Sequence, residues 1–523
     1  MPVLKQTRNE IARQVMPLLL FGVALIGSNR NFTFIDDEVW ILDGAAQPVR
    51  TTLALFRSGV GQHEHPPLYD ILLHFWLRWT GGSFEYLRVP SVLFFLAGLF
   101  LLARAAHRLG GPSSAMAVVW LGALWPFGFH YGRLAAWYSF SFFLIAGLTL
   151  AYLRYVEEQS FGRWAVLFLS GVALLWTNYF GWALLGCLAI DQFDRHRLAE
   201  RAVRPAVLAG TAALFGVAYV PLFRAFRREI ATGVNVHHGA TAVIANAAFN
   251  VYSLFVSESV APWHWFLSVP AGLAVLACVL LVLLYAPRSS RRFLLYGALL
   301  IAVMAVTGIL VTKRLFLVAP WVLLPLAVAV GAKMPRWARF GLALALLAVG
   351  GIGWYGIYSR HYYSALRFME PWPTIAQDAA NKIQGGATVI ANNPSFFFYL
   401  TYSLRVPSNG TKWKFAGLLP DEVRHPHVTS ADEWIASGHP LATTMIWVRG
   451  MADPQTQGPM DDAAQELGQS CGAQTSRMMM RDEGYLWKQR FFPGPSGLLW
   501  RIEVREYDCA STNSKEIFHI PQR

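Results

Sequence analysis

The sequence predicts an α-helical polytopic membrane protein with about eleven transmembrane helices and a C-terminal soluble α/β domain. The first reason is composition: 55% of the 523 residues are hydrophobic and 14% are charged, with a mean hydropathy of +0.37, whereas soluble domains carry about 25% charged residues. The second reason is a series of apolar segments separated by basic loops up to residue 359. The third is a shift to a soluble composition over residues 360–523.

Eleven apolar segments account for the membrane region, residues 1–359. They cover residues 15–28, 89–106, 115–129, 137–152, two halves of 164–193, 206–223, 266–285, 294–311, 316–332 and 340–358. The run 164–193 is divided near residue 178 because one crossing takes roughly 20 residues. With this count the loops rich in Lys and Arg lie on the side of the N-terminus, as the cytoplasmic bias of basic residues requires. No small-residue cleavage site follows the first segment, which predicts a retained helix.

The first external loop, residues 29–88, contains three adjacent acids. Asp36, Asp37 and Glu38 follow the first apolar segment directly, and such charges are costly beside lipid unless they face water or a polar cavity. A solvated loop is the alternative interpretation. Two helices lying at the membrane surface are expected in the loop, over residues 39–57 and 66–79, since apolar residues recur there at helical spacing.

A second polar group in this loop is formed by Glu64 and His65, which precede Pro66 and Pro67. Proline is tolerated in the first turn of a helix, so the prolines are expected to hold Glu64 and His65 at the start of the second surface helix. The two groups of ionisable residues would then face each other at the membrane surface. A simple helix-capping role is the alternative, both for His65 and for Glu38.

Basic residues are also expected on this outer side. Arg88 precedes the second apolar segment, Arg133 lies between the third and fourth beside Tyr138, and Lys313 and Arg314 are an adjacent pair. Because external basic residues run against the positive-inside bias, an anionic partner is the economical explanation. For Arg88 the alternative is an anchor to lipid headgroups.

Several short motifs resemble those of the GT-C glycosyltransferases. They are the DE pair at 37–38, HPPLY at 65–69, LRVPS at 87–91, RxxxWYS at 133–139 and KRLFLVAP at 313–320. Within this group the chain is most similar to the branch that contains the protein O-mannosyltransferases, the lipid A aminoarabinose transferases and the rhizobial lipopolysaccharide transferases. The resemblance covers residues 15–330 and fades in the C-terminal third.

The resemblance implies an inverting glycosyltransferase, either a hexosyl or a pentosyl transferase. Its donor would be a polyprenyl phosphate carrying one monosaccharide, and its acceptor a hydroxyl of a glycan, lipid or protein of the cell envelope. Asp37 would be the base that removes the acceptor proton. Glu38 would orient it, and Asp36 is an extra acid that leaves the position of the base ambiguous by one residue.

The remaining candidates are assigned to substrate binding. Arg133 with Lys313 or Arg314 would hold the departing phosphate. Glu64 and His65 would contact hydroxyl groups of the sugar or the acceptor, and Arg88 and Tyr138 are further candidate substrate contacts. No metal or other cofactor is required by such a donor, although the three acids leave room for a divalent cation.

Charge and cysteine content bear on partners and compartment. The net charge of +13 arises entirely within residues 1–359, since residues 360–523 carry 16 basic and 16 acidic side chains. A basic excess confined to the membrane region indicates membrane lipids or phosphate groups as partners, with no nucleic acid. Cys187 and Cys278 are expected to be packing residues. Cys471 and Cys509 would pair if the C-terminal domain lies outside the cytoplasm, in the periplasm of a cell with an inner membrane.

The C-terminal domain is predicted to alternate helices and strands, with a structural or substrate-capping role. Helices are expected at 374–383, 394–404 and 461–467, and strands at 387–392, 443–448 and 498–504. Two other functions are open for the whole chain. One is a multipass transporter or flippase for a lipid phosphate, which predicts internal repeats that the sequence lacks. The other is a non-catalytic membrane assembly partner.

Overall fold

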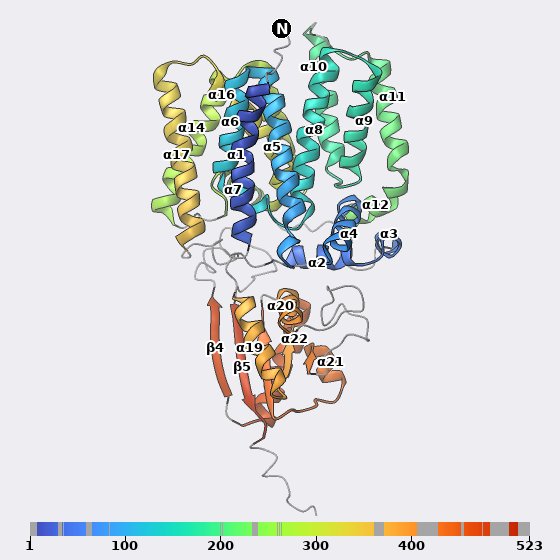
Figure 1. Ribbon diagram of the computed structural model, residues 1–523, viewed down its shortest axis with the longest axis vertical. Coiled ribbons are helices and arrows are strands. Elements are labelled where there is room, and N and C mark those ends of the chain that lie inside the picture. Colours follow the sequence, from blue (N-terminus) through green and yellow to red (C-terminus); the bar gives the residue numbers. More distant parts are fainter. Residues whose placement is uncertain are drawn as a thin grey trace, which may run out of the picture. The chain divides into compact units, whose positions relative to one another are not determined.

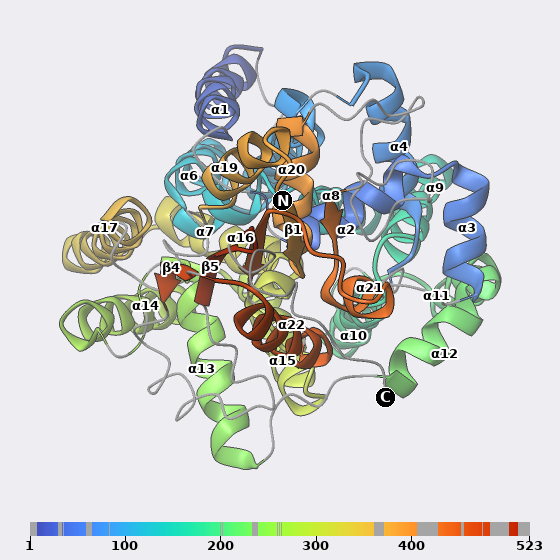
Figure 2. The same cartoon turned by 90° about the horizontal axis from the view of Figure 1, so that it is seen from below.

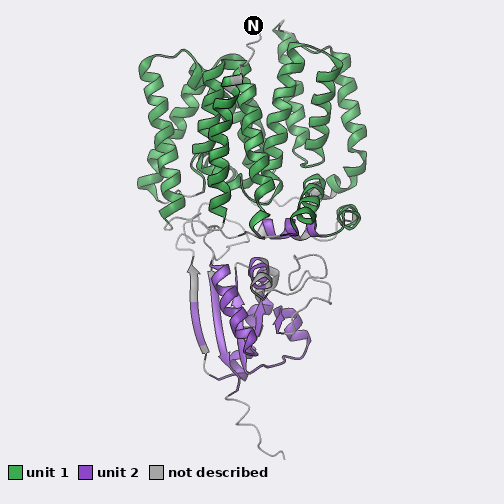
Figure 3. Cartoon of the chain, viewed as in Figure 1, with its two compact units in different colours: residues 1–31, 47–80, 84–365 green, residues 32–46, 81–83, 366–523 purple. Residues whose placement is uncertain are grey.

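The chain forms two compact units in the computed structural model (Figure 3). Unit 1 contains residues 1–31, 47–80 and 84–365, and unit 2 contains residues 32–46, 81–83 and 366–523. The structure describes residues 8–29, 34, 36–58, 65–82, 84–198, 200, 202–232, 239–258, 260, 262, 264–359, 371–404, 427–450, 454–472, 474–481 and 501–510.

Unit 1 is a bundle of helices (Figure 1). They are α1 (Arg8–Ser28), α3 (Val49–Ser58), α4 (Leu68–Thr80), η2 (Phe84–Tyr86), α5 (Val89–Gly110), α6 (Pro112–Leu124), α7 (Pro126–Tyr131), α8 (Trp137–Glu157), α9 (Phe161–Leu175), α10 (Gly181–Arg197), α11 (Pro205–Tyr219), η3 (Val220–Leu222), α12 (Phe223–Thr232), α13 (Ala240–Val256), α14 (Trp265–Tyr285), α15 (Arg288–Val306), η4 (Thr312–Leu317), α16 (Ala319–Gly331) and α17 (Arg336–Ser359). Figure 2 shows α14 and α17 on one side of this unit, α9, α11 and α12 on the other, and α8 and α16 between them.

The helices of unit 1 have the length and composition of a multi-pass membrane protein. Among the described residues, seven helices are long and apolar enough to cross a bilayer, and α6, α9, α13 and α16 are shorter apolar helices. Each of the eleven segments expected from the sequence overlaps a helix. The number of crossings stays a prediction. Exposed apolar side chains such as Leu169, Leu273 and Leu347 lie on the outer helices, as lipid-facing surfaces require.

One expectation about the connecting segments is wrong. The surface helix expected over 39–57 is divided into α2 (Asp36–Ala46) and α3, because Pro48 starts the second helix and lacks the N–H group that a continuous helix needs. The segment between the spans expected at 206–223 and 266–285 contains α12 and α13. The second surface helix is present as α4 and begins at Leu68, after both prolines.

The packing of unit 1 depends on close contacts between α5 and its neighbours. A Cβ atom at Gly98 of α5 would lie 2.6 Å from Phe142 of α8, and one at Gly122 of α6 would lie 2.4 Å from Leu99 of α5. Both glycines therefore allow helices to approach closely, as small residues do in membrane bundles.

A buried polar network joins α8, α10 and α15. The side chain of Asp191 is 3% exposed and pairs with Arg195 at 2.5 Å and with Arg292 at 3.4 Å. Its carboxylate also accepts hydrogen bonds from the hydroxyls of Tyr152 and Tyr296. A buried carboxylate requires such partners, so Asp191 fixes three helices relative to one another.

Unit 2 combines α2 with a five-stranded sheet and its helices. The helices are α19 (Trp372–Gln384), α20 (Pro394–Leu404), α21 (Ala431–Ala436) and α22 (Pro454–Ser470); the strands are β1 (Thr388–Ala391), β2 (Val428–Thr429), β3 (Thr444–Arg449), β4 (Gln474–Arg481) and β5 (Arg501–Asp508). The sheet order is β2-β1-β3-β5-β4. Strand β1 pairs in parallel with β2 and β3, whereas β5 pairs antiparallel with β3 and β4. The predicted α/β character is confirmed, and β2, β4 and α21 were not expected.

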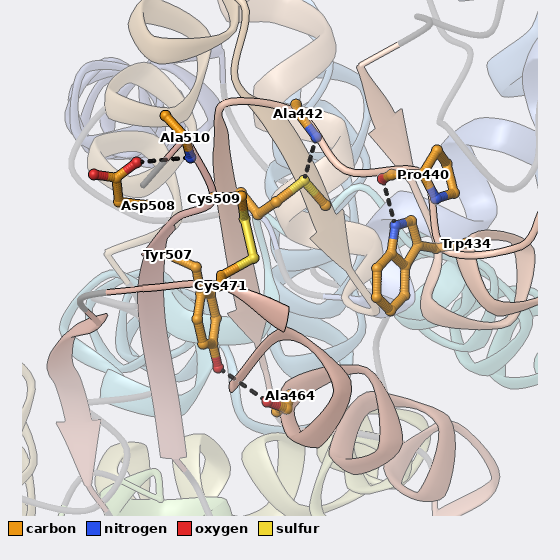
Figure 4. Close-up of a disulfide and its surroundings, with 10 residues drawn as sticks. Trp434, Pro440, Ala442, Ala464, Cys471, Tyr507, Asp508, Cys509 and Ala510 are labelled. Atoms are coloured by element: carbon orange, nitrogen blue, oxygen red, sulfur yellow. Dashed lines mark hydrogen bonds between the residues drawn. A yellow bond between two sulfur atoms is a disulfide. The ribbon is translucent and has the colours of Figure 1, made fainter. Parts of the chain in front are cut away.

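A disulfide joins Cys471, after α22, to Cys509, after β5 (Figure 4). It lies in a core that includes Trp434, Trp447 and Met460, all within 1% exposure. The pairing expected for these two cysteines is therefore present. Cys187 and Cys278 are buried and free, as expected of packing residues.

Candidate active site

A group of aromatic side chains surrounds the start of α8 in unit 1. Trp137 lies with its ring centroid 4.8 Å from His65 and 4.4 Å from Tyr138. Tyr138 meets Tyr131 of α7 edge-on at 6.1 Å, and His65 lies 6.5 Å from Tyr179, in the break between α9 and α10. We call these five residues the aromatic wall. It brings together His65 and Tyr138, two of the residues selected from the sequence.

Tyr131 of the aromatic wall contacts an acidic residue, Glu258, that was not among the candidates selected from the sequence. The hydroxyl of Tyr131 donates a 2.9 Å hydrogen bond to the carboxylate of Glu258, which is 5% exposed. The preceding residues form a parallel pair, since His130 Nδ1 lies 2.9 Å from the hydroxyl oxygen of Ser257. Ser257 has a φ of 68°, which costs on the order of 1 kcal/mol or more for a residue with a side chain. These contacts fix Glu258 against α7.

One simple signal in the sequence marks Glu258. It is the sole acidic residue between Glu229 and Glu370. An isolated acid among apolar segments indicates a function by default. Glu258 falls between two expected spans, 206–223 and 266–285, where a carboxylate attracts little notice.

The basic pair Lys313 and Arg314 lies in η4, between α15 and α16. Arg314 donates to the carbonyl of Ile309 at 2.8 Å, and its guanidinium lies 5.9 Å from the ring centroid of Phe180. The same short helix places Phe316 6.5 Å from Tyr131. The short helix η4 therefore meets the aromatic wall through Phe316, and its Arg314 lies near Phe180, which follows Tyr179 in the sequence.

Arg88 and Arg133 are both 1% exposed. Arg133 donates to the hydroxyl of Ser28 at 3.3 Å and lies 4.5 Å above the ring of Phe129. Arg88 donates to the carbonyl of Asn29 at 3.4 Å. Both guanidinium groups therefore reach the end of α1, and their burial places them in the protein interior rather than on a lipid-facing surface.

The acids of the DE pair belong to α2, in unit 2. Glu38 is fully buried and Asp37 is half-buried. Phe34, three residues before Asp37, is held by α20: the N–H of Phe34 donates to the hydroxyl of Tyr399 at 2.8 Å, and the hydroxyl of Ser395 donates to the carbonyl of Phe34 at 3.2 Å. The C-terminal domain thus positions the chain that leads into the acids.

Two sequence candidates lie outside what the structure describes. Glu64 is one, and the side chain of Asp36 is the other. The other six substrate-binding candidates belong to unit 1, whereas Asp37 and Glu38 belong to unit 2. Within the described part of the chain, no group of three or more His, Cys, Asp or Glu side chains gathers as metal ligands do.

The helical bundle with a small α/β domain defines a class of protein, the multi-pass membrane proteins with the GT-C fold. Two similar solved structures are those of ArnT from Cupriavidus metallidurans. The structure bound to undecaprenyl phosphate aligns over 99% of this chain and 100% of that chain, with a TM-score of 0.52 and 13% identity. The apo structure aligns over 98% and 99%, with a TM-score of 0.54 and 14% identity.

No family model and no curated protein sequence matches the chain. The GT-C fold expected from the short motifs is confirmed by the structural match, and it extends through the C-terminal third, where the motifs fade.

Proposed function

We propose that this protein is an inverting glycosyltransferase that moves a monosaccharide from a polyprenyl-phosphate donor to a hydroxyl group of a cell-envelope acceptor. The observation that carries the proposal is the match along the full chain to ArnT, whose crystal structure contains undecaprenyl phosphate. The aromatic wall, with basic residues at its edge, supports it, because sugars pack on aromatic faces and phosphates need fixed cations.

The phosphate of the donor is assigned to Arg314 and Lys313, assisted by Arg133. Arg314 is held by Ile309 and Phe180, so its guanidinium loses little freedom when it binds an anion. Positive groups fixed in this way stabilise the charge that develops on the leaving phosphate. His65, Tyr138 and Glu258 are assigned to hydroxyl groups of the sugar.

The reaction step conserves atoms and charge without a redox partner. Asp37 takes the proton of the acceptor hydroxyl as that oxygen forms a bond to the anomeric carbon. The bond from this carbon to the phosphate oxygen breaks, its electron pair leaves with polyprenyl phosphate, and the configuration inverts. The hydrogen bonds between Phe34 and the side chains of α20 support this assignment, since a base must be positioned by rigid elements.

An apolar cavity of about 280 Å³ gives the polyprenyl chain a place in unit 1. It lies between α6, α13, α16 and α17 and is lined by residues such as Leu121, Leu254, Leu323, Leu347 and Trp354. Cavities with predominantly hydrophobic linings are typical of lipid and small-molecule sites.

The active site is assigned to the outer side of the inner membrane, with the C-terminal domain in the periplasm. Two observations support this. The disulfide between Cys471 and Cys509 suits an oxidising compartment. Basic residues lie in or beside the connections after α5, α8, α10, α14 and α16, and these connections are assigned to the cytoplasmic side, as positive-inside topology requires.

Release of polyprenyl phosphate from a panel of polyprenyl-phosphate sugars tests the proposal. The purified full-length protein should release it from at least one donor when an envelope glycolipid acceptor is present. Arg314→Gln should weaken donor binding and turnover together, because the charge meets the phosphate before and during the reaction. Arg336→Gln is the matched control, since this arginine is exposed at the start of α17. Absence of release from every donor, with folded protein, would refute the proposal.

A further inference from the structure

Four arginines gather at the end of the bundle opposite the aromatic wall. Arg104 and Arg108 lie in the last two turns of α5, Arg154 in the last turn of α8, and Arg163 in the first turn of α9. The three helices lie side by side (Figure 1). Arg104, Arg108 and Arg163 are all close enough to Arg154 to repel its charge. We call these four residues the arginine cluster.

Two glutamates offset only half of this charge. Glu157 pairs with Arg108, and Glu158 pairs with Arg163 at 2.5 Å. Arg163 also donates to the carbonyl of Arg154 at 2.8 Å, which satisfies the end of α8. Among these six side chains an excess of two positive charges remains, carried by Arg104 and Arg154.

Arg104 and Arg154 also have hydrogen-bonding atoms that nothing satisfies in the described part of the chain. These are Nη1 of Arg104 and Nε of Arg154, both enclosed by protein atoms. A buried donor without a partner costs about 1–3 kcal/mol, and more when it is charged. Chains tolerate such a cost where a ligand supplies the acceptor.

We propose that the arginine cluster binds the phosphate group of an anionic glycerophospholipid. A phosphodiester supplies both the negative charge and the two acceptor oxygens that Arg104 and Arg154 lack. Exposed apolar side chains flank Arg163 on α9, with Phe161 80% and Val166 56% exposed. They offer a surface for an acyl chain, which favours a lipid over free phosphate as the source of the group.

This site is separate from the donor site. Arg104 lies sixteen residues after Arg88 on the same helix, a separation of roughly 24 Å at 1.5 Å per residue. A lipid at the arginine cluster would therefore stabilise the packing of α5, α8 and α9 without entering the active site.

The test is the thermal unfolding midpoint of the purified protein in detergent, titrated separately with dioleoylphosphatidylglycerol, dioleoylglycerol and inorganic phosphate. Phosphatidylglycerol should raise the midpoint of the wild-type protein, whereas the other two should not. The double variant Arg104→Gln/Arg154→Gln should bind phosphatidylglycerol at least about tenfold more weakly, because both unsatisfied donors are lost. Arg336→Gln, which changes an exposed arginine of α17, should bind as wild type does.

Three results would overturn the proposal. Equal stabilisation by inorganic phosphate would identify a free anion site, equal stabilisation by dioleoylglycerol would identify a purely apolar one, and unchanged lipid binding by the double variant would exclude the cluster. If the double variant does not fold, Arg104→Gln alone provides the answer, since the loss of one donor should still weaken binding by roughly threefold or more.

Discussion

Replacing Glu258 with glutamine tests the proposed contact between this residue and a hydroxyl group of the sugar. Glutamine keeps the size of the side chain and still accepts a hydrogen bond from Tyr131, but it removes the charge. The contact with the Tyr131 hydroxyl measures 2.9 Å, and Glu258 is 5% exposed. A hydrogen bond to a buried charged group contributes about 1.5–3 kcal/mol, so a comparable contact to a sugar hydroxyl corresponds to roughly a ten- to hundredfold change in transfer.

The assay measures kcat and KM for polyprenyl phosphate release by the wild-type protein, Glu258→Gln, Tyr131→Phe and the double variant. If the two residues act together on the sugar, the double variant should lose much less than the sum of the two single losses. The thermal unfolding midpoint separates this from a structural role, because Glu258→Gln should keep the midpoint near wild type. Wild-type kinetics for Glu258→Gln would show that Glu258 does not contact the substrate.

Three further changes have defined outcomes. Asp37→Asn should lower transfer by roughly 10²- to 10⁴-fold with little effect on donor binding, while Asp36→Asn stays near wild type; the opposite result would move the base by one residue. Asp191→Ala removes the carboxylate that pairs with Arg195 and Arg292 and leaves the hydroxyls of Tyr152 and Tyr296 without their acceptor, while Glu200 still contacts both arginines. The free energy of unfolding should therefore fall by at least about 1–3 kcal/mol, and an unchanged unfolding midpoint would contradict this. Cys471 and Cys509 should resist alkylation until reduced, and immediate labelling would show free thiols.

The membrane region could be predicted well because its signal is local. Each helix that crosses a bilayer must satisfy its own backbone hydrogen bonds and present apolar side chains, so composition within a short window identifies it. The expected break near residue 178 illustrates this: α9 ends at Leu175 and α10 begins at Gly181. The helices between residues 224 and 265 give a weaker signal, because α12 is strongly amphipathic and α13, although apolar, has 17 residues and carries Asn246 and Asn250.

The candidate site could be predicted only where a residue is conspicuous in its own segment. Arg133 and Arg314 interrupt apolar sequence, and an isolated charge there suggests a ligand. Glu258 is an isolated acid in the sequence, but its pairing with Tyr131 is a contact across 127 positions. Long-range pairing of this kind depends on tertiary packing that no sequence window contains.

The contacts of Phe34 show how residues of the C-terminal domain hold the chain before α2. This residue is separated from Ser395 by 361 positions and from Tyr399 by 365, yet both of its backbone groups bond to their side chains. Its ring also lies 5.1 Å from that of Phe398. Because a backbone segment with both groups satisfied is fixed in position, α20 determines where α2 begins. Residues of α20 therefore hold the chain just before the helix that carries Asp37 and Glu38, which accounts for the presence of α2 in unit 2.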